Sequence, residues 1–426
     1  MRQIQEELWP SARPQVDTTT FLRNTGEPIH RWFRYSAGFS ASWVNEVIQE
    51  AKSRQEVRVL DPFTGSGTVL LEAERCGVSS IGLEVQPFVA RIARAKLLWR
   101  SDPNVFEKHA QKAVAAAKTI VPDTSVYPPL IQQCYPAPTL EALDQLRRGL
   151  QEVWNDAPES ELAWLALASI LRLTSPVGTA SWQYVLPKKS KANTSEPFQA
   201  FVEKIRQMAS DLRLRQAAPY GPQAILLEQD ARTCAGVPDK WVTLVVTSPP
   251  YANNFDYADS TRLEMSFFLE IRGWGDLQAV ARQNLVRSCT QHVAALHLNI
   301  EELLSDPVLD PIASEMKEVC AGLGQEKALH GGKKQYDIMI ASYFADLARV
   351  WVALRRCCAP EATVCFVVGD SAPYGVHVPV ERWLGELAVA AGFRSWRFEK
   401  LRDRNTKWKN RKHRVLLHEG RLWVHG

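Results

Sequence analysis

Four residues at the end of an apolar run carry groups that could hold a flat polar ligand. The run covers residues 241–246 and is rich in β-branched side chains, which predicts a buried parallel strand. The residues that follow it are Ser248, Pro249, Pro250 and Tyr251. Because two successive prolines restrict the backbone and lack N–H groups, this turn is stiff and leaves carbonyl oxygens available as acceptors. We therefore expect a rigid binding turn at the end of a strand.

The exocyclic amine of a nucleobase is a flat group that such a turn could hold. Its lone pair is delocalised into the ring, so a site that alkylates it must accept hydrogen bonds from the NH₂ and orient the nitrogen. The Ser248 hydroxyl and the Pro249 carbonyl could accept those bonds, and the Tyr251 ring could stack on an extruded base. A proline-stiffened loop without chemistry is the alternative that this motif alone leaves open.

A glycine-rich turn near the N-terminus is the second candidate site. Residues 57–60 predict a strand, and residues 69–76 predict a helix that Gly77 ends. Between them lie Asp61, Pro62, Phe63, Thr64, Gly65, Ser66, Gly67 and Thr68. Glycines at this place let the backbone approach a ligand, and a helix start offers free N–H groups. The turn is not a P-loop, since no Gly-Lys-Ser/Thr follows, and it lacks the third glycine of a dinucleotide motif.

The two motifs together resemble those of the amino-methyltransferase family of DNA methylases. The glycine-rich string resembles the family's cofactor motif, and Ser-Pro-Pro-Tyr resembles its catalytic motif. The resemblance covers residues 30–100 and 221–426. It implies a doubly wound, Rossmann-like α/β methyltransferase sheet of about seven strands with a C-terminal hairpin. Because the cofactor motif comes first, the permuted members of the family are excluded.

The resemblance also implies how S-adenosylmethionine is held. Residues 80–84 predict a strand, and Glu84 at its end would bind the ribose hydroxyls, although a solvated glutamate is the alternative. Asp230 ends a later strand and would accept from the adenine amine. Phe39 and Ser40 precede a predicted helix and would approach the methionine end. The full set of expected cofactor residues is Phe39, Ser40, Asp61, Pro62, Phe63, Gly65, Ser66, Gly67, Thr68, Glu84, Asp230 and Ala231.

Residues 101–220 interrupt the α/β pattern. Apolar spacings of three and four predict helices over 105–119, 139–154, 159–173 and 196–214. We therefore divide the chain into a catalytic domain, residues 1–100 and 221–426, and a mainly helical insert, residues 101–220. The insert is our first candidate for the target-recognition region, and residues 258–335 are the second.

Two basic tracts are candidates for contact with DNA. The first lies in the insert among aromatic residues, and the second, residues 402–414, is the most basic stretch of the chain. Each could equally be a solvated loop. The polar-aromatic loop after the Ser-Pro-Pro-Tyr turn is expected to border the base pocket. The residues expected to contact DNA or the base are Lys188, Lys189, Asn253, Tyr257, Arg404, Lys407 and Lys409.

Composition limits the class of protein without assigning a function. The chain has 426 residues, 46% of them apolar, and a net charge of +4, which permits nucleic-acid binding without arguing for it. Its eight cysteines include no CxxC pair, so we expect reduced thiols in a cytoplasmic protein and no metal site. No apolar run reaches the roughly 18 residues of a membrane span.

We therefore expect a methyltransferase that acts on the N4 amine of a flipped-out cytosine in double-stranded DNA, since the serine form of the motif resembles cytosine-specific relatives. Three alternatives stay open: methylation of the adenine N6 amine, methylation of an RNA base amine, and a non-catalytic DNA-binding subunit of the same fold. A cognate restriction endonuclease or another defence-system subunit is an expected partner.

Overall fold

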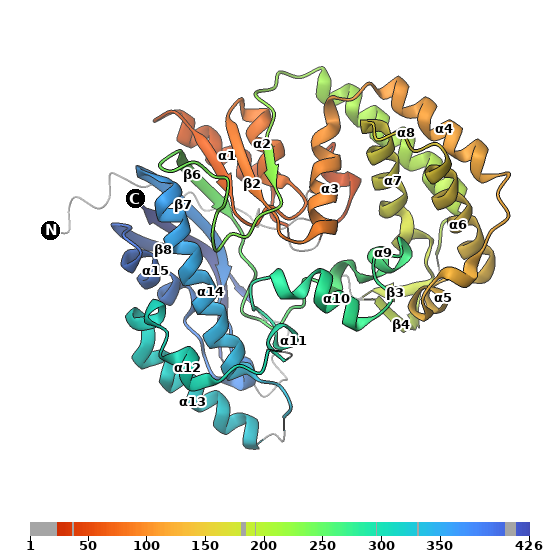
Figure 1. The fold of residues 1–426 in the computed structure, drawn as a ribbon. Coiled ribbons are helices and arrows are strands. Elements are labelled where there is room, and N and C mark those ends of the chain that lie inside the picture. Colours follow the sequence, from red (N-terminus) through yellow and green to blue (C-terminus); the bar gives the residue numbers. More distant parts are fainter. Residues whose placement is uncertain are drawn as a thin grey trace.

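One mixed sheet of seven strands forms the centre of the described chain outside the predicted insert. The computed structural model describes residues 24–35, 38–179, 185–191, 193–294, 296–329, 332–404 and 415–426. Within them, seven strands pair in the order β5-β2-β1-β6-β7-β9-β8 (Figure 1). The strands are β1 (Arg58–Asp61), β2 (Ser79–Leu83), β5 (Ile225–Leu227), β6 (Val242–Thr247), β7 (Cys358–Gly369), β8 (Ser395–Arg404) and β9 (Leu417–His425). The predicted doubly wound methyltransferase sheet with its C-terminal hairpin is confirmed.

The strands that carry the two motifs are direct neighbours. Strand β1 pairs in parallel with β2 on one side and with β6 on the other, with Leu60 opposite both Ile81 and Val245. The carboxyl ends of parallel strands lie at the same edge of a sheet. The glycine turn after β1, Glu84 after β2 and the proline turn after β6 therefore meet at one edge, although they are distant in sequence.

Helices cover both faces of this sheet because its central strands alternate their side chains. Leu60, Val245 and Phe366 share a core with α14 (Tyr336–Cys357) and α15 (Val380–Ala390). The residues next to these three in each strand point to the opposite face of the sheet. There they pack with α1 (Ala41–Lys52) and α2 (Thr68–Cys76). A strand buried on both faces reads as a continuous apolar run, which is the pattern seen over 241–246. The other helices of this part are α3 (Pro87–Leu97), α11 (Thr290–Val293), α12 (Ile300–Leu304) and α13 (Ala313–Leu329).

The insert forms a helical lobe beside the sheet (Figure 1). Its helices are α4 (Pro103–Ala117), α5 (Pro129–Cys134), α6 (Ala137–Glu152), α7 (Pro158–Thr174) and α8 (Pro197–Gln216). The core of this lobe also contains side chains of α9 (Arg262–Phe267) and α10 (Trp274–Val280). Arg172 of α7 and Glu264 of α9 join the two segments by an ion pair at 2.6 Å. The insert therefore packs with residues that directly follow the proline turn.

The segment between α7 and α8 differs from the basic loop that the sequence indicated. It contains two short antiparallel strands, β3 (Val177–Thr179) and β4 (Val185–Ser190). The charged residues of this stretch indicated a loop. Strands this short have too few alternating residues to be recognised. In the part of the chain that the structure describes, no helix is long and apolar enough to cross a membrane.

Candidate active site

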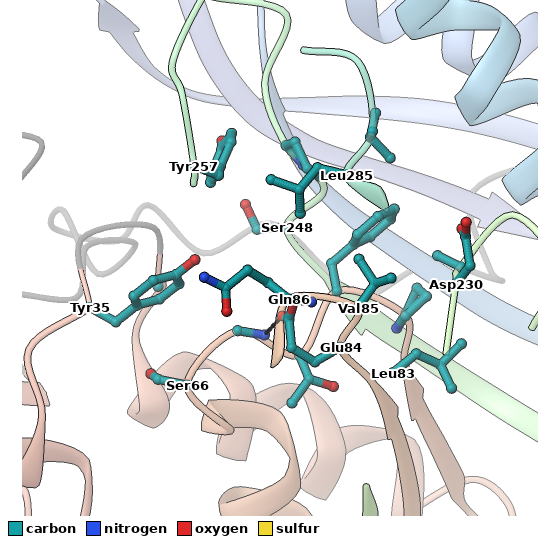
Figure 2. A pocket seen from close by; sticks show the side chains of 18 of the residues that line it. Tyr35, Ser66, Leu83, Glu84, Val85, Gln86, Asp230, Ser248, Tyr257 and Leu285 are labelled. Atoms are coloured by element: carbon teal, nitrogen blue, oxygen red, sulfur yellow. Dashed lines mark hydrogen bonds between the residues drawn. The ribbon is translucent and has the colours of Figure 1, made fainter. Parts of the chain in front are cut away.

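One pocket combines the glycine turn and the proline turn. It encloses about 820 Å³ of space that is partly open to solvent, a size in the usual range for a small-molecule site. Figure 2 shows Ser66 and Glu84 on one side of it and Ser248 and Tyr257 on the other. The expected residues that line it are Phe39, Pro62, Phe63, Gly65, Ser66, Thr68, Glu84, Asp230, Ala231, Ser248, Pro250 and Tyr257.

The glycine turn has a backbone that only glycine adopts readily. Gly65 has φ of 53° and Gly67 has φ of 89°, both in the left-handed region. A Cβ atom on Gly65 would lie 3.1 Å from the Tyr35 ring. Gly67 is the N-cap of α2, so the turn leads directly into the helix start. The turn thus leaves room for a ligand to approach its backbone.

Glu84 is tied to the glycine turn by its carboxylate. One oxygen accepts from the Gly65 N–H and the other from the Gln86 N–H, each at 2.9 Å. Burial raises the pKa of Glu84 to about 7, although the two N–H donors act in the opposite direction. Each carboxylate oxygen keeps a lone pair that can accept from a ribose hydroxyl.

An unpaired hydroxyl in the same pocket supports binding of a polar cofactor. The Ser66 hydroxyl is buried, and no group among the described residues hydrogen-bonds to it. An unsatisfied buried hydroxyl is unfavourable, so a ligand that bonds to it is favoured. A carboxylate for a ribose, a free hydroxyl and a glycine turn open to the ligand together fit S-adenosylmethionine.

Three expected cofactor residues support the pocket without lining it. Ser40 is the N-cap of α1, where its hydroxyl accepts from the Trp43 N–H. Asp61 accepts from the Thr247 hydroxyl at 2.6 Å and from the Phe63 N–H at 3.1 Å, so it connects the glycine turn to β6. Burial raises the pKa of Asp61 to about 7. Gly67 only shapes the turn.

Asp230 lies at the far end of the pocket from Tyr35 (Figure 2). Its carboxylate also binds the guanidinium of Arg232, with Nε at 2.8 Å and Nη2 at 2.6 Å from Oδ2. This pairing leaves fewer lone pairs for an adenine amine than the sequence implied. The assignment of Asp230 to the adenine stays a prediction.

Ser248 of the proline turn lines the pocket, and hydrogen bonds to β7 and to Tyr257 anchor the turn. The Ser248 hydroxyl donates to the Val367 carbonyl of β7 at 3.3 Å. The Tyr251 N–H donates to the Tyr257 hydroxyl at 3.0 Å. Pro250 lines the pocket with Ser248, whereas Pro249 and Tyr251 are not among its lining residues. Burial raises the pKa of Tyr257 to about 12, so its phenol is neutral at physiological pH.

The expected DNA contacts are dispersed over the molecule. Lys188 and Lys189 lie on β4 of the helical lobe, and Lys407 and Lys409 lie outside the described residues. Asn253 accepts from the Phe255 N–H at 3.2 Å and does not line the pocket. The guanidinium of Arg404 lies over the Tyr251 ring, with its carbon 5.4 Å from the ring centre.

Several residues that line the pocket were not among those predicted from the sequence. The ring of Tyr35, the side chain of Gln86 and the segment 284–286 also line the pocket. Tyr35 belongs to an aromatic-rich stretch before α1, which was a usable signal. Segment 284–286 has none, because Leu285 joins the core of the helical lobe and Val286 joins the core that contains α14, which no local pattern indicates.

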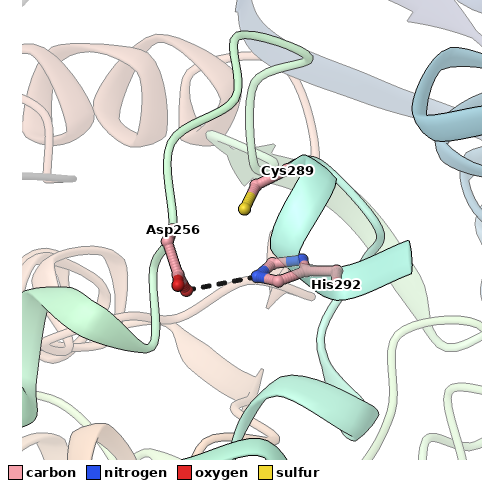
Figure 3. A group of neighbouring side chains, drawn as sticks. All are labelled: Asp256, Cys289 and His292. Carbon is pink, nitrogen blue, oxygen red and sulfur yellow. Dashed lines mark hydrogen bonds and ion pairs between the residues drawn. The ribbon is translucent and has the colours of Figure 1, made fainter. Parts of the chain in front are cut away.

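Two groups of side chains place three potential metal ligands within 4.8 Å of one another in the described ranges. The first is Asp256, Cys289 and His292 (Figure 3). There the Arg282 guanidinium already binds Asp256, with Nη2 at 2.6 Å, so the carboxylate is neutralised and anchors the loop after the proline turn.

The second group is Asp370, just after β7, Glu381 in the first turn of α15, and His418 at the start of β9. Burial raises the pKa of Asp370 to about 8, and the neighbouring Glu381 carboxyl adds to this rise. The Asp370 carboxyl is therefore largely protonated at neutral pH.

The order of the sheet is that of the Rossmann-like methyltransferase fold, and the glycine turn and the proline turn meet at its edge. No family model matches the chain. It is 23% identical to the type II methyltransferase M.BsoBI of Geobacillus stearothermophilus in an alignment of 442 positions, gaps included, which covers 91% of this chain and 84% of the relative. It is 24% identical to the type II methyltransferase M.AvaI of Anabaena variabilis, over 88% of this chain and 81% of the relative.

A shorter match has higher identity. Over 39 residues, 9% of this chain and 7% of the relative, the chain is 46% identical to the type II methyltransferase M.MjaII of Methanocaldococcus jannaschii. The resemblance to methyltransferases that the motifs predicted is confirmed by these relatives.

Proposed function

We propose that this protein is a DNA methyltransferase that transfers the methyl group of S-adenosylmethionine to the exocyclic N4 amine of cytosine. The observation that carries the proposal is the placement of Ser248 in the same pocket as Glu84 and the glycine turn. A methyl donor held by the turn would thus face a hydroxyl that can orient an amine. The names of the relatives support methyl transfer.

The hydrogen bond made by Ser248 suits the role of an acceptor. Its proton is directed to the Val367 carbonyl, so the oxygen keeps lone pair density for an incoming N–H. The Pro249 carbonyl would take the second amine hydrogen. Two acceptors would fix the amine plane and aim its nitrogen in line with the methyl group. Catalysis would then come from positioning and electrostatics.

When bound, S-adenosylmethionine supplies the electrophilic methyl group. Glu84 would hold its ribose, Asp230 would lie by its adenine, and the Ser66 hydroxyl would bond to a polar group of the methionine. The target base would leave the helix, which costs a few kcal/mol, and would enter beside Tyr251 and Tyr257.

Methylation of a ring carbon is a different reaction, because it requires a cysteine nucleophile. No cysteine is among the residues that line the pocket within the described ranges, and all eight cysteines are buried. An amine is therefore the favoured acceptor. A neutral serine in place of an aspartate favours the cytosine amine, and methylation of adenine N6 is the second candidate.

The type II label of the relatives supports two further proposals. The protein would act in the cytoplasm on double-stranded DNA, and a restriction endonuclease of the same sequence specificity would accompany it. Protection of DNA from cleavage in an extract of the source cells would test the second of these.

The deciding experiment is nucleoside mass spectrometry of DNA methylated in vitro with labelled S-adenosylmethionine. N4-methylcytosine is the expected product, and Ser248→Ala protein serves as the matched control. A product of N6-methyladenine would refute the cytosine assignment and keep the enzyme class, whereas 5-methylcytosine would overturn the role of the proline turn. Label found only in an RNA substrate would point to an RNA methylase, and no label in either polymer would favour a binding subunit.

A further inference from the structure

Arg404 has a place in the fold that differs from that of a phosphate contact. It is the last residue of β8, in the tract that the sequence assigned to DNA backbone binding. Its side chain is only 16% exposed. The guanidinium carbon lies 5.4 Å from the centre of the Tyr251 ring, within the range of a cation–π contact.

Two elements hold the Arg404 guanidinium in this position. Its Nη1 donates to the Asp370 carbonyl, just after β7, at 3.0 Å. Its Nε lies 4.0 Å from the Glu419 carboxylate of β9, which partly neutralises it. One N–H is thus bonded to a backbone carbonyl, and the nearby carboxylate offsets part of the charge that would attract a phosphate.

The backbone beside Arg404 is adapted to its passage. A Cβ atom on Gly369 would lie 2.5 Å from Nη1 and 3.3 Å from Cδ of Arg404. Any larger residue at this position would displace the side chain. The absence of a side chain at Gly369 therefore allows Arg404 to reach from the hairpin to the proline turn.

Tyr251 connects Arg404 to the reacting groups. Its N–H donates to the Tyr257 hydroxyl, which lines the pocket, and it lies three residues after Ser248 in the same stiff turn. We propose that Arg404 is a positioning residue: by holding the Tyr251 ring it fixes the turn that carries Ser248, and so sets the approach of the target amine to the methyl group. This inference rests on the proposed methyl transfer.

The phosphate reading and the positioning reading predict different results for Arg404→Ala. A lost phosphate contact would reduce the slope of log affinity against log salt by about one and leave transfer from the saturated complex unchanged. A lost support for Tyr251 would slow single-turnover transfer by about tenfold at saturating DNA and cofactor, with an unchanged salt slope. Lys400→Ala, on the same strand with a side chain 56% exposed, is the control expected to keep the wild-type rate.

A double-mutant cycle with Tyr251→Ala decides whether Arg404 acts through this ring. We expect Arg404→Ala to slow the wild-type protein by about tenfold and the Tyr251→Ala protein by less than about twofold. Arg404→Lys should give an intermediate rate, because an ammonium keeps the charge and loses the planar group that reaches both partners. Equal slowing in both backgrounds, or a reduced salt slope at an unchanged rate, would overturn the inference.

The four proteins of the cycle, which are the wild type, the two single alanine variants and the double variant, separate this inference from the proposed function. If wild-type protein gives no labelled product, the methyl-transfer proposal fails, and the cycle is read from denaturant midpoints instead. There, Arg404→Ala should lower the midpoint of the wild-type protein more than that of the Tyr251→Ala protein. Additive midpoints would show that the two side chains do not act together, and the inference would then fail independently of activity.

Discussion

The side of the pocket proposed for the cofactor and the side proposed for the target base are built in different ways; we call them the cofactor side and the target side. On the cofactor side, the glycine turn and Glu84 come from two consecutive strands, and backbone N–H groups of Gly65 and Gln86 hold the carboxylate. On the target side, Ser248 depends on β7, and Tyr251 depends on a residue of β8. Residues that are close in sequence can be recognised as a motif. A site that combines distant strands forms only when the whole sheet is formed.

This difference predicts that the two sides can be disabled separately. Changes in the glycine turn should remove cofactor binding, and changes around Ser248 should slow transfer while both ligands still bind. The following predictions test that separation, from the largest expected effect to the smallest.

Gly65→Val should have the largest effect. A β-branched residue at φ of 53° is strongly disfavoured, and its Cβ would meet the Tyr35 ring at 3.1 Å. We expect the affinity for S-adenosylmethionine to fall on the order of 10²-fold or more, measured by calorimetry. Gly324→Ala in α13, where a Cβ meets nothing within 4 Å, is the matched glycine control. Wild-type affinity in the valine variant would remove the glycine turn from the cofactor site.

Ser248→Ala should slow methyl transfer by about 10²-fold, because one positioned polar group is lost. Calorimetric affinity for S-adenosylmethionine and the affinity for DNA should stay at their wild-type values, since the cofactor side does not depend on this hydroxyl. Single-turnover kinetics at saturating ligands would measure the rate. A loss of cofactor affinity in this variant would contradict the separation of the two sides.

The pH dependence of cofactor binding should report Glu84. Its pKa is raised to about 7 in the folded protein from 4.5, so its protonated form stabilises the fold below pH 4.5, and this contribution is lost as pH rises through 7. Ribose hydroxyls donate preferentially to the ionised carboxylate. Affinity should therefore rise by about tenfold between pH 6 and pH 8.

Glu84→Gln tests the origin of that pH dependence. The amide does not titrate, so its calorimetric affinity should be weaker and flat over the same range. Asp61 has a pKa of about 7 as well but does not line the pocket. A pH dependence that persists in the Glu84→Gln variant would assign the titration to Asp61.

The basic tracts should give the smallest effects. Replacing Lys407 and Lys409 by alanine should reduce the salt slope of DNA affinity by about one for each lost phosphate contact, and the same holds for Lys188 and Lys189. Cofactor affinity should not change. Comparing the two pairs would show whether DNA contacts both the helical lobe and the C-terminal hairpin, and an unchanged slope in either pair would identify that tract as a solvated surface.

The fold was largely predictable because its signals are local. Local patterns predicted β1, β2 and β6, and helical periodicity predicted α4, α6, α7 and α8 within a few residues, whereas the short helix α5 was not predicted. Gly77 ends α2 in a left-handed conformation, as its position after the apolar pattern indicated. The hairpin β3–β4 was missed because two short strands among charged residues carry little periodicity.

The sequence by itself determined the chemistry that is available: a glycine turn that leaves space for a ligand, an acidic strand end and a stiff turn that carries a serine. Those properties depend on residue types and on neighbours within a few positions. Only the tertiary structure decided which groups face one another. It placed Arg404 against Tyr251 and joined segment 258–285 to the helical lobe. The physical reason is that these contacts arise from the pairing of distant strands and from shared burial, which no local pattern in the chain encodes.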